Sequence, residues 1–477
     1  MASDEAAVLF EALPDQVVPE RVGGGAPRLR QAERGQIEWR PFSLDQLVPE
    51  DHRVRLVWQF VAELDLTLLL VAIKAVEGQA GHPPADPRIL VALWLYATVK
   101  KIGSARELAR LCEEHIAFRW LCGGVSMNAK TLADFRVNHG DVLERLLADS
   151  FTALVRAGVA SLDRVAQDGM RVRASAGAAS FRRHSTLEEC RRDAEQAIAD
   201  LRAQVEADPG AATRQQAAAR QRAVAEREQR VRAALAVTAE LQAQQQEQAR
   251  RDAERAAREA ERAAKQVPQD ATKAAKSKTA AAEPKKPAEP RASTTDPEAR
   301  TMKMADGGFR PAVNVQLATD TASRAILGVE VINAGVDAGQ LEPMRKQVED
   351  RSGGKVREHL ADGGYLTFDD VDAAAAQDVT LYLPPKPPRD PEKNGTQYEP
   401  RKSDSAAVKD WRQRMGTGQA REIYKERAAT SETVNADLTG FRGLVQLTVR
   451  GLAKARCAAL WCALAYNLMH FGRAMLA

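Results

Sequence analysis

Two aspartates stand where short strand patterns give way to glycine. Asp168 lies within RVAQDGMRVR (164–173), and Asp362 ends KVREHLAD (355–362) just before two glycines. Because glycine lets a backbone turn sharply, we expect the second carboxylate at the lip of a sheet, open to solvent and substrate. Carboxylates that lie close together repel unless a cation separates them, and hard oxygen ligands suit Mg²⁺ or Mn²⁺. Two such ions about 4 Å apart support phosphodiester chemistry.

A third acid is normally needed at such a site, and the stretch REIYKERAATSETVNADL (421–438) offers candidates. On a regular helix Glu432 lies roughly 80° from Tyr424 and about 140° from Arg427. An arginine there can hold a DNA phosphate by a forked contact, while the glutamate binds a metal ion. Taken alone, the pattern favours an ordinary charged helix face.

Other acids have simpler interpretations. Asp306 in MADGGF nearly repeats the motif around Asp362, but no apolar strand leads into it, so we interpret it as a turn residue. Asp320 and Asp337 close or follow strands, and we interpret both as turn caps. For Asp168 itself, the Asp-Gly pair is also a hairpin-turn signal, and the pattern alone does not decide.

The elements around the acids alternate between strand and helix. The expected strands are 164–173, 311–320, 325–333, 355–362 and 379–385, and the expected helices are 340–350 and 368–377. Three successive strands can form an antiparallel meander, and a strand that follows a helix can return parallel beside the first. This topology places the ends of the two acid-bearing strands side by side. Helices are expected from about 406 onward.

A long helical insertion separates the first two strands. Within 186–265 the apolar positions recur at heptad-like steps, and an Asp-Pro-Gly break divides them, which predicts an antiparallel coiled-coil hairpin. These positions are Leu187, Cys190, Ala194, Ala197, Leu201, Val231, Ala234, Thr238 and Leu241. Residues 266–300 are rich in proline and lysine without apolar period, which predicts a disordered linker. The hairpin has two open interpretations, self-association and a solvated spacer.

The N-terminal part is helical in pattern after a loose leader, residues 1–40. Across 41–160, capping signals such as Asp86-Pro87 precede apolar residues spaced by three and four. Short helices joined by glycine-containing turns suit either a helix-turn-helix DNA-binding domain or a plain helical bundle. Our candidates for DNA contacts in this region are Lys130 and Arg136.

Composition restricts the classes of protein. The net charge of +4 is mild, so a nucleic-acid surface must be a local patch. The five cysteines are odd in number and show no Cys-x-x-Cys pair, which indicates reduced thiols. Cys112 and His115 have the spacing of metal ligands, but their amphipathic context favours packing. No signal peptide or membrane span is evident, so we expect a cytoplasmic protein.

The chain resembles an insertion-sequence transposase of the DDE, RNase H-like superfamily. It is most similar to the bacterial branch with a long helical insertion after the first catalytic strand. The resemblance rests on LVPEDHRVR (47–55), residues 83–124, TLADFR (131–136), residues 168–183, residues 292–320, LADGGY (360–365) and YKERAATSETVNA (424–436). It implies an α/β fold, in which an RNase H-like mixed sheet is interrupted by the hairpin and preceded by an all-α domain. Residues 161–185 and 301–477 would form the catalytic domain.

The resemblance also implies site residues. The family's three metal-binding, catalytic acids carry over as Asp168, Asp362 and Glu432, which would hold two Mg²⁺ or Mn²⁺ ions. Contacts to DNA would come from Tyr424, Lys425 and Arg427. Two features depart from the wider pattern: four residues separate the arginine and the glutamate, and Thr439 stands where a lysine is common. Glu422 and Glu426 therefore remain rivals for the third acid.

The expected function is that of a DNA transposase. It would bind terminal inverted repeats, cleave the strand at the element's end, and join the freed 3′-hydroxyl to target DNA. Pairing two DNA ends calls for a homodimer or a larger assembly, and a bacterial location at the nucleoid follows. The alternative is an inactive DNA-binding relic that acts as a repressor.

Overall fold

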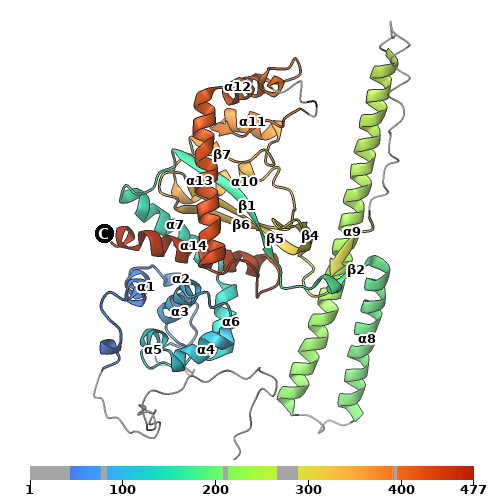
Figure 1. Ribbon diagram of the computed structural model, residues 1–477. Coiled ribbons are helices and arrows are strands. Elements are labelled where there is room, and N and C mark those ends of the chain that lie inside the picture. Colours follow the sequence, from blue (N-terminus) through green and yellow to red (C-terminus); the bar gives the residue numbers. More distant parts are fainter. Residues whose placement is uncertain (1–42, 77–82, 208–212, 266–287, 389, 391–394) are drawn as a thin grey trace, which may run out of the picture. The chain divides into compact units, whose positions relative to one another are not determined.

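The computed structural model describes residues 43–76, 83–207, 213–265, 288–388, 390 and 395–477 (Figure 1). The expected leader at 1–40 lies outside these ranges. Residues 44–477 form one compact unit. That unit combines a helical N-terminal region with a mixed sheet, so the predicted α/β class is confirmed.

The sheet has the topology that the sequence predicts. Its strands are β1 (Arg164–Arg173), β4 (Arg300–Lys303), β5 (Phe309–Asp320), β6 (Ile326–Ile332), β7 (Glu358–Leu360) and β8 (Thr380–Tyr382). β1, β5 and β6 form the antiparallel meander, and β7 and β8 run parallel to β1. The resulting strand order is β6-β5-β1-β7-β8. β4 extends the sheet beside the start of β5. The central place of β1 puts Asp168 opposite Leu317 of β5.

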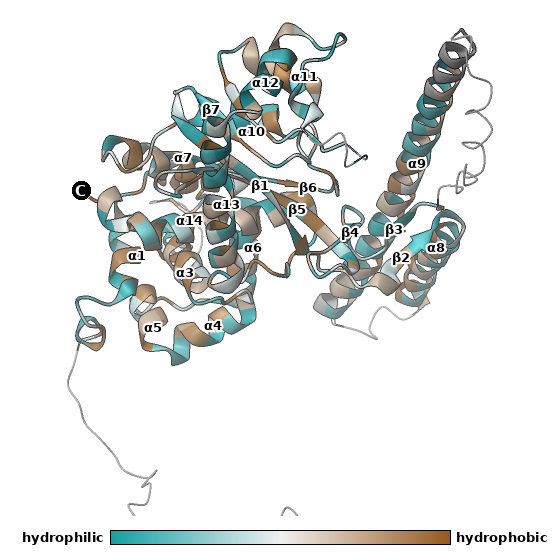
Figure 2. Ribbon diagram, turned by 45° about the horizontal axis from the view of Figure 1, so that its top comes forward, coloured by the Kyte–Doolittle hydropathy of each residue, from teal (hydrophilic) through white to brown (hydrophobic). Residues whose placement is uncertain are grey.

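The helices pack against the sheet and against other helices. The C-terminal half contributes α10 (Leu341–Ser352), α11 (Phe368–Ala375), α12 (Ala406–Met415), α13 (Gly418–Gly440) and α14 (Leu452–Met475). α13 crosses β1, as Figure 1 shows, and α14 packs against β6. Most residues of β5 and β6 are buried, and hydrophobic stretches along these strands are visible in Figure 2. None of the helices in the described part of the chain combines the length and apolarity that a membrane crossing requires.

The N-terminal helices share the core of the sheet. They are α1 (Arg53–Ala62), α2 (Thr67–Val71), α3 (Pro87–Val99), α4 (Ala105–Glu114), α5 (Ile116–Cys122), α6 (Ala129–Asn138) and α7 (Gly140–Arg156), after a 3₁₀ turn at Asp45–Leu47. Asp86 caps α3 as expected. Asn128 caps α6 through a hydrogen bond from the Thr131 N–H to its side chain. One apolar cluster joins these helices to β5, β6 and α14, so the region does not fold around a core of its own.

The insertion is a helical hairpin, α8 (His184–Ala207) and α9 (Arg214–Lys265). The two helices lie side by side, and the buried positions among those predicted are Leu187, Ala194, Val231, Ala234 and Thr238. A two-stranded ribbon, β2 (Phe181–Arg183) with β3 (Arg291–Ser293), joins the start and the end of the insertion. The prediction of a disordered linker was wrong for its C-terminal end, because residues 291–293 form β3 and residue 300 begins β4. Residues 266–287 lie outside the described ranges.

Candidate active site

The two strand-borne acids come together beneath α13. β7 pairs with residues 164–166 of β1 in parallel, so Asp168 and Asp362 both follow the paired part of neighbouring strands. Arg427 on α13 lies against both: its Nη2 is 2.6 Å from Asp168 Oδ1 and 3.6 Å from Asp362 Oδ2. One guanidinium thus balances two carboxylates that would otherwise repel each other.

Asp168 is the more enclosed of the two acids, with 18% of its side chain exposed against 41% for Asp362. Its second oxygen accepts a hydrogen bond from Asn435 Nδ2 at 2.8 Å. Burial raises the pKa of Asp168, the charge of Asp362 raises it further, and Arg427 and Asn435 act in the opposite direction. Arg427 and Asn435 therefore hold the carboxylate in place by hydrogen bonds, while burial and the charge of Asp362 disfavour its ionised form.

The face of α13 that meets Asp168 follows from simple helical spacing. Arg427, Ser431 and Asn435 are spaced by four, so they form one stripe along the helix. Ser431 is buried between the two residues that contact Asp168. Tyr424, one turn before Arg427, packs against the cluster that contains Trp411, and burial raises its pKa. Asn435 was not among the predicted site residues, although its position eight residues after Arg427 indicates a shared helix face.

The glycines after Asp362 are needed for close approach rather than for an unusual backbone angle. Neither has a positive φ, which corrects the expectation that they provide conformational freedom. A Cβ at Gly363 would lie 3.0 Å from the Pro384 carbonyl oxygen, and one at Gly364 would lie 2.8 Å from Asp362 Oδ1. The Gly364 N–H donates to that same oxygen at 2.6 Å, which fixes the carboxylate in the turn.

Comparison with protein families agrees with this geometry. Residues 42–138 match a transposase domain (DUF772), and residues 272–468 match a transposase DDE domain. The chain belongs to the DDE-type insertion-sequence transposases. The second match begins beyond the hairpin helices, so it includes Asp362 and Glu432 but not Asp168. No curated protein and no solved structure gives a match.

The third acid expected in the transposase does not join the pair. Glu432 is exposed on α13, because it follows the buried Ser431 by one residue and so lies about 100° round the helix. Of the rivals, Glu426 accepts a bond from Arg164 at 2.6 Å, and Glu422 pairs with Lys425 at 2.7 Å. Within the described ranges, no group of three or more His, Cys, Asp or Glu side chains is placed to hold a metal ion.

The donor set nevertheless suits a divalent cation in part. Asp168 and Asp362 supply hard oxygen ligands from two strands. A cationic group, Arg427, already lies against both of them. The two aspartates therefore fit a metal ion, while the third ligand has to come from a side chain that the structure places elsewhere.

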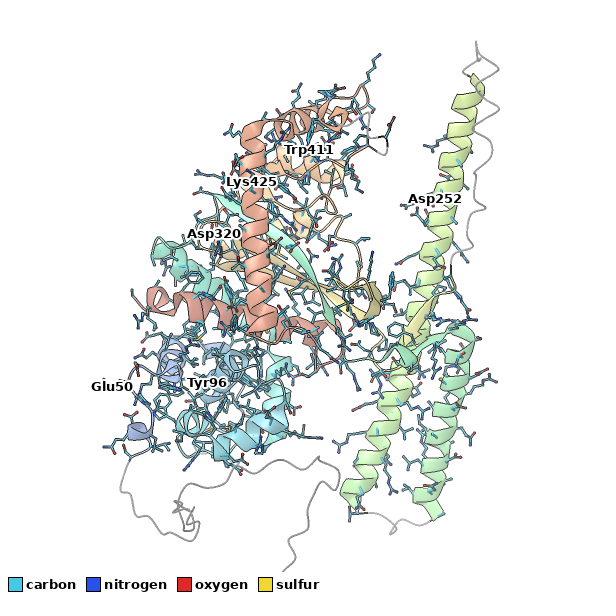
Figure 3. The ribbon with its side chains drawn as sticks, viewed as in Figure 1. Glu50, Tyr96, Asp252, Asp320, Trp411 and Lys425 are labelled. Atoms are coloured by element: carbon cyan, nitrogen blue, oxygen red, sulfur yellow. The ribbon has the colours of Figure 1, made fainter. Side chains whose placement is uncertain are left out.

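The candidate DNA contacts of the transposase differ in their freedom to reach a ligand. Lys425 is exposed on α13 (Figure 3), where it pairs with Glu422. Lys130 is likewise exposed, and pairs with Asp134 at 2.6 Å. Arg136 instead bonds to the carbonyl oxygen of Gly103 at 2.5 Å and to Thr448 Oγ1 at 2.8 Å. Its guanidinium is thus engaged in joining α6 to the loop before α14.

Among the other acids, two are turn residues as expected. Asp306 accepts the Gly308 N–H at 3.0 Å in the turn between β4 and β5, and Asp320 accepts the Ser323 N–H at 2.8 Å. Asp337 is different, which corrects the interpretation of it as a cap. Its side chain is buried behind the sheet.

A buried polar network lies on the face of β1 and β5 opposite Asp168. Asp337 accepts bonds from Asn314 at 2.7 Å, from Gln316 at 2.8 Å and from Arg171 at 3.0 Å. Gln316 in turn accepts a bond from the Tyr365 hydroxyl at 2.5 Å. Tyr365 follows Asp362 by three residues, so the network ties the Asp362 turn to the central strands. Two amides at alternate positions in the apolar run PAVNVQLATD were the available signal.

Proposed function

We propose that the transposase binds the terminal inverted repeats of its element and carries out metal-dependent strand cleavage and strand transfer. The observation that supports this is the meeting of Asp168 and Asp362 at one guanidinium, two residues beyond the segment in which β1 and β7 pair in parallel. Divalent metal ions could replace the arginine between the two carboxylates because both are cations, and the released guanidinium could then hold a DNA phosphate.

The residues divide the work as follows. Asp168 and Asp362 hold Mg²⁺ or Mn²⁺, and Glu432 is the third acid. When bound, two such ions activate the attacking oxygen and stabilise the leaving one. Arg427 and Tyr424 contact the DNA backbone beside the scissile phosphate, with Lys425 and Lys130 further out. The hairpin contributes to a homodimer or larger assembly that pairs two DNA ends, in the bacterial cytoplasm at the nucleoid.

The test is strand cleavage by an Asp168→Asn variant. A duplex that carries the inverted repeats flanking the coding sequence is incubated with Mg²⁺ or Mn²⁺, and nicks are resolved on a denaturing gel. The variant should bind the duplex and lose cleavage. The matched control is Asp306→Asn, which alters an exposed turn acid and should cleave normally. Metal-dependent cleavage that survives in Asp168→Asn would refute the assignment.

A second function is favoured by one observation, the position of Glu432 outside the pair. A relic that binds repeats without cutting would act as a repressor of its own element. It predicts salt-dependent binding of the repeat duplex by the wild type and no cleavage with Mn²⁺. Cleavage by the wild type would eliminate this alternative.

A further inference from the structure

A small pocket of aromatic and cationic side chains lies directly beyond the Asp362 turn. Its volume is about 250 Å³. Its lining is Leu366, Phe368, Pro385, Lys386, Arg401, Trp411 and Arg412. None of these residues belongs to the acid pair or to the stripe on α13. Ligand pockets for drug-sized molecules span roughly 300–1,000 Å³, so this one suits a single planar ring system.

The pocket is built onto the same turn that carries Asp362. Leu366 and Phe368 follow that acid by four and six residues. On the other side, the Pro384 carbonyl oxygen presses against Gly363, and Pro384 leads directly into two pocket residues, Pro385 and Lys386. Asp362 and part of the pocket lining therefore belong to one short stretch of the chain, so a DNA strand held at Asp362 can extend toward the pocket.

One side of the Phe368 ring is fixed and the other is open. Arg412 lies over this ring at 5.3 Å, and over Trp411 at 5.5 Å. Arg412 is itself held by Asp404 at 2.8 Å, which neutralises its charge in a buried pair. Thr367 caps the helix that begins at Phe368. The phenyl ring is thus presented rigidly, and 46% of the residue is exposed.

Two cationic side chains that line the same pocket form no ion pair within the described part of the chain. Lys386 and Arg401 are both exposed, and neither forms an ion pair within 4 Å among the residues that the structure describes. The nearby Asp404 accepts the backbone N–H of Arg401 at 2.9 Å, but its side-chain ion pair is with Arg412. An open aromatic face next to unpaired cations is the combination that binds single-stranded nucleic acid, because bases stack on the ring while phosphates contact the cations.

We propose that this pocket binds one unpaired nucleotide of the DNA strand held at Asp362, with its base on Phe368 and its phosphate at Lys386 and Arg401. The inference rests on the proposed function, since it assumes that DNA occupies the acid pair. It goes beyond that function by predicting a preference for DNA ends with a single-stranded extension.

The experiment measures binding without catalysis. Fluorescence anisotropy in EDTA compares a labelled duplex that carries a three-nucleotide extension with the blunt duplex. The wild type should prefer the extended duplex by about tenfold, the size expected for one stacked base. Phe368→Leu should lose the preference and Phe368→Tyr should keep it, because tyrosine retains the ring. Unchanged melting temperatures would show that both variants fold.

The charges are tested with a double variant, Lys386→Gln with Arg401→Gln. The slope of log affinity against log salt for the extended duplex should fall by about 1.4, for two lost contacts to a single strand. The control is Lys346→Gln with Arg357→Gln, which removes two exposed cations from elsewhere on the unit and should leave the slope unchanged. Equal binding of extended and blunt duplexes by the wild type, or a preference that survives Phe368→Leu, would overturn the proposal.

Failure of this inference is distinguishable from failure of the proposed function. Asp168→Asn should keep the preference for the extended duplex while losing cleavage. Cleavage by the wild type without a preference for the extended duplex would refute the proposed role of the pocket and leave the catalytic assignment standing. A preference without cleavage would leave the pocket in place and remove the catalytic assignment.

Discussion

The two faces of β1 hold acids in opposite ways. Behind the strand, Asp337 is 7% exposed, and the Asn314 and Gln316 side chains that bind it project from β5 of the same sheet. In front, Asp168 is bound by Arg427 and Asn435, which both come from α13. Partners within a sheet are fixed by strand register, whereas partners on a helix depend on how that helix packs.

The partners of Asp337 and of Asp168 differ in whether a second carboxylate shares them. The back acid is satisfied by short amides and one arginine, and it has no second carboxylate to balance. The front acid shares its arginine with Asp362, which lies 3.6 Å from the same nitrogen. The metal and DNA binding that we propose for the front pair requires a counter-ion that can be exchanged, whereas the back acid keeps the same partners in the folded core. Substitutions on the two faces should therefore have opposite signatures.

The largest expected effect is on the front face. Asp362→Asn should reduce cleavage by on the order of 10³-fold or more, since it removes a charge needed only during reaction. The melting temperature should stay close to that of the wild type, because the asparagine oxygen can still accept the Gly364 N–H. Gel-based cleavage and thermal denaturation measure the two quantities. A variant that cleaves normally would place the site elsewhere.

On the back face, Asp337→Ala should act on stability. It removes the shared acceptor of Arg171, Asn314 and Gln316, of which Arg171 and Asn314 keep a backbone carbonyl, and this loss costs about 3 kcal/mol in the free energy of unfolding. Urea denaturation measures this loss. The control is Asp350→Ala, which breaks an exposed pair with Lys346 on α10 and should cost roughly 0–1 kcal/mol. Equal losses in the two variants would contradict the contrast between the faces.

Gly169→Ala tests how tightly the back network meets β1. A Cβ there would lie 2.6 Å from Asp337 Oδ1 and 2.8 Å from Asn314 Oδ1, so strands or side chains must shift. We expect a loss of about 1–3 kcal/mol in the free energy of unfolding, as for other overpacked sites. Gly177→Ala, which meets no atom within 4 Å, is the control and should be neutral. A neutral Gly169→Ala would show that the network yields easily.

The smallest effect is a pH dependence on the front face. The pKa of Asp168 is raised in the folded protein, chiefly by burial, so its ionisation opposes folding. This penalty is complete above the folded-state pKa and disappears as the pH falls toward the unfolded value. Compared with Asp168→Asn, the wild type should therefore gain stability as the pH is lowered from 7 through that window. Urea midpoints at several pH values would show it, and parallel curves would contradict it.

The sheet could be predicted from the sequence because its information is local. Alternating apolar residues gave the strands, and the rule for parallel returns placed the ends of the two acid-bearing strands together. The third acid could not be predicted in this way. The rotation of α13 about its axis is set by the burial of Ser431, Val434 and Leu438, which is a tertiary property. The roles of the three acids stay predictions.

Two further features depended on long-range contacts. The helical region at 41–160 has the pattern of an independent domain, yet it buries its apolar residues against α14, more than 300 positions away in some pairs, such as Phe135 with Trp461. The polar network behind β1 joins residues from four separate segments. No window of sequence contains either arrangement, so no local pattern could show it.

The β2–β3 ribbon has a consequence for how this chain can change. Because Phe181 pairs with Ser293, the two ends of the long insertion lie side by side in a two-stranded ribbon that is separate from the main sheet. The number of residues between β2 and β3 therefore need not affect the register of β1 and β5. An insertion of a different length could be accommodated at this point while Asp168 and Asp362 keep their places in the main sheet.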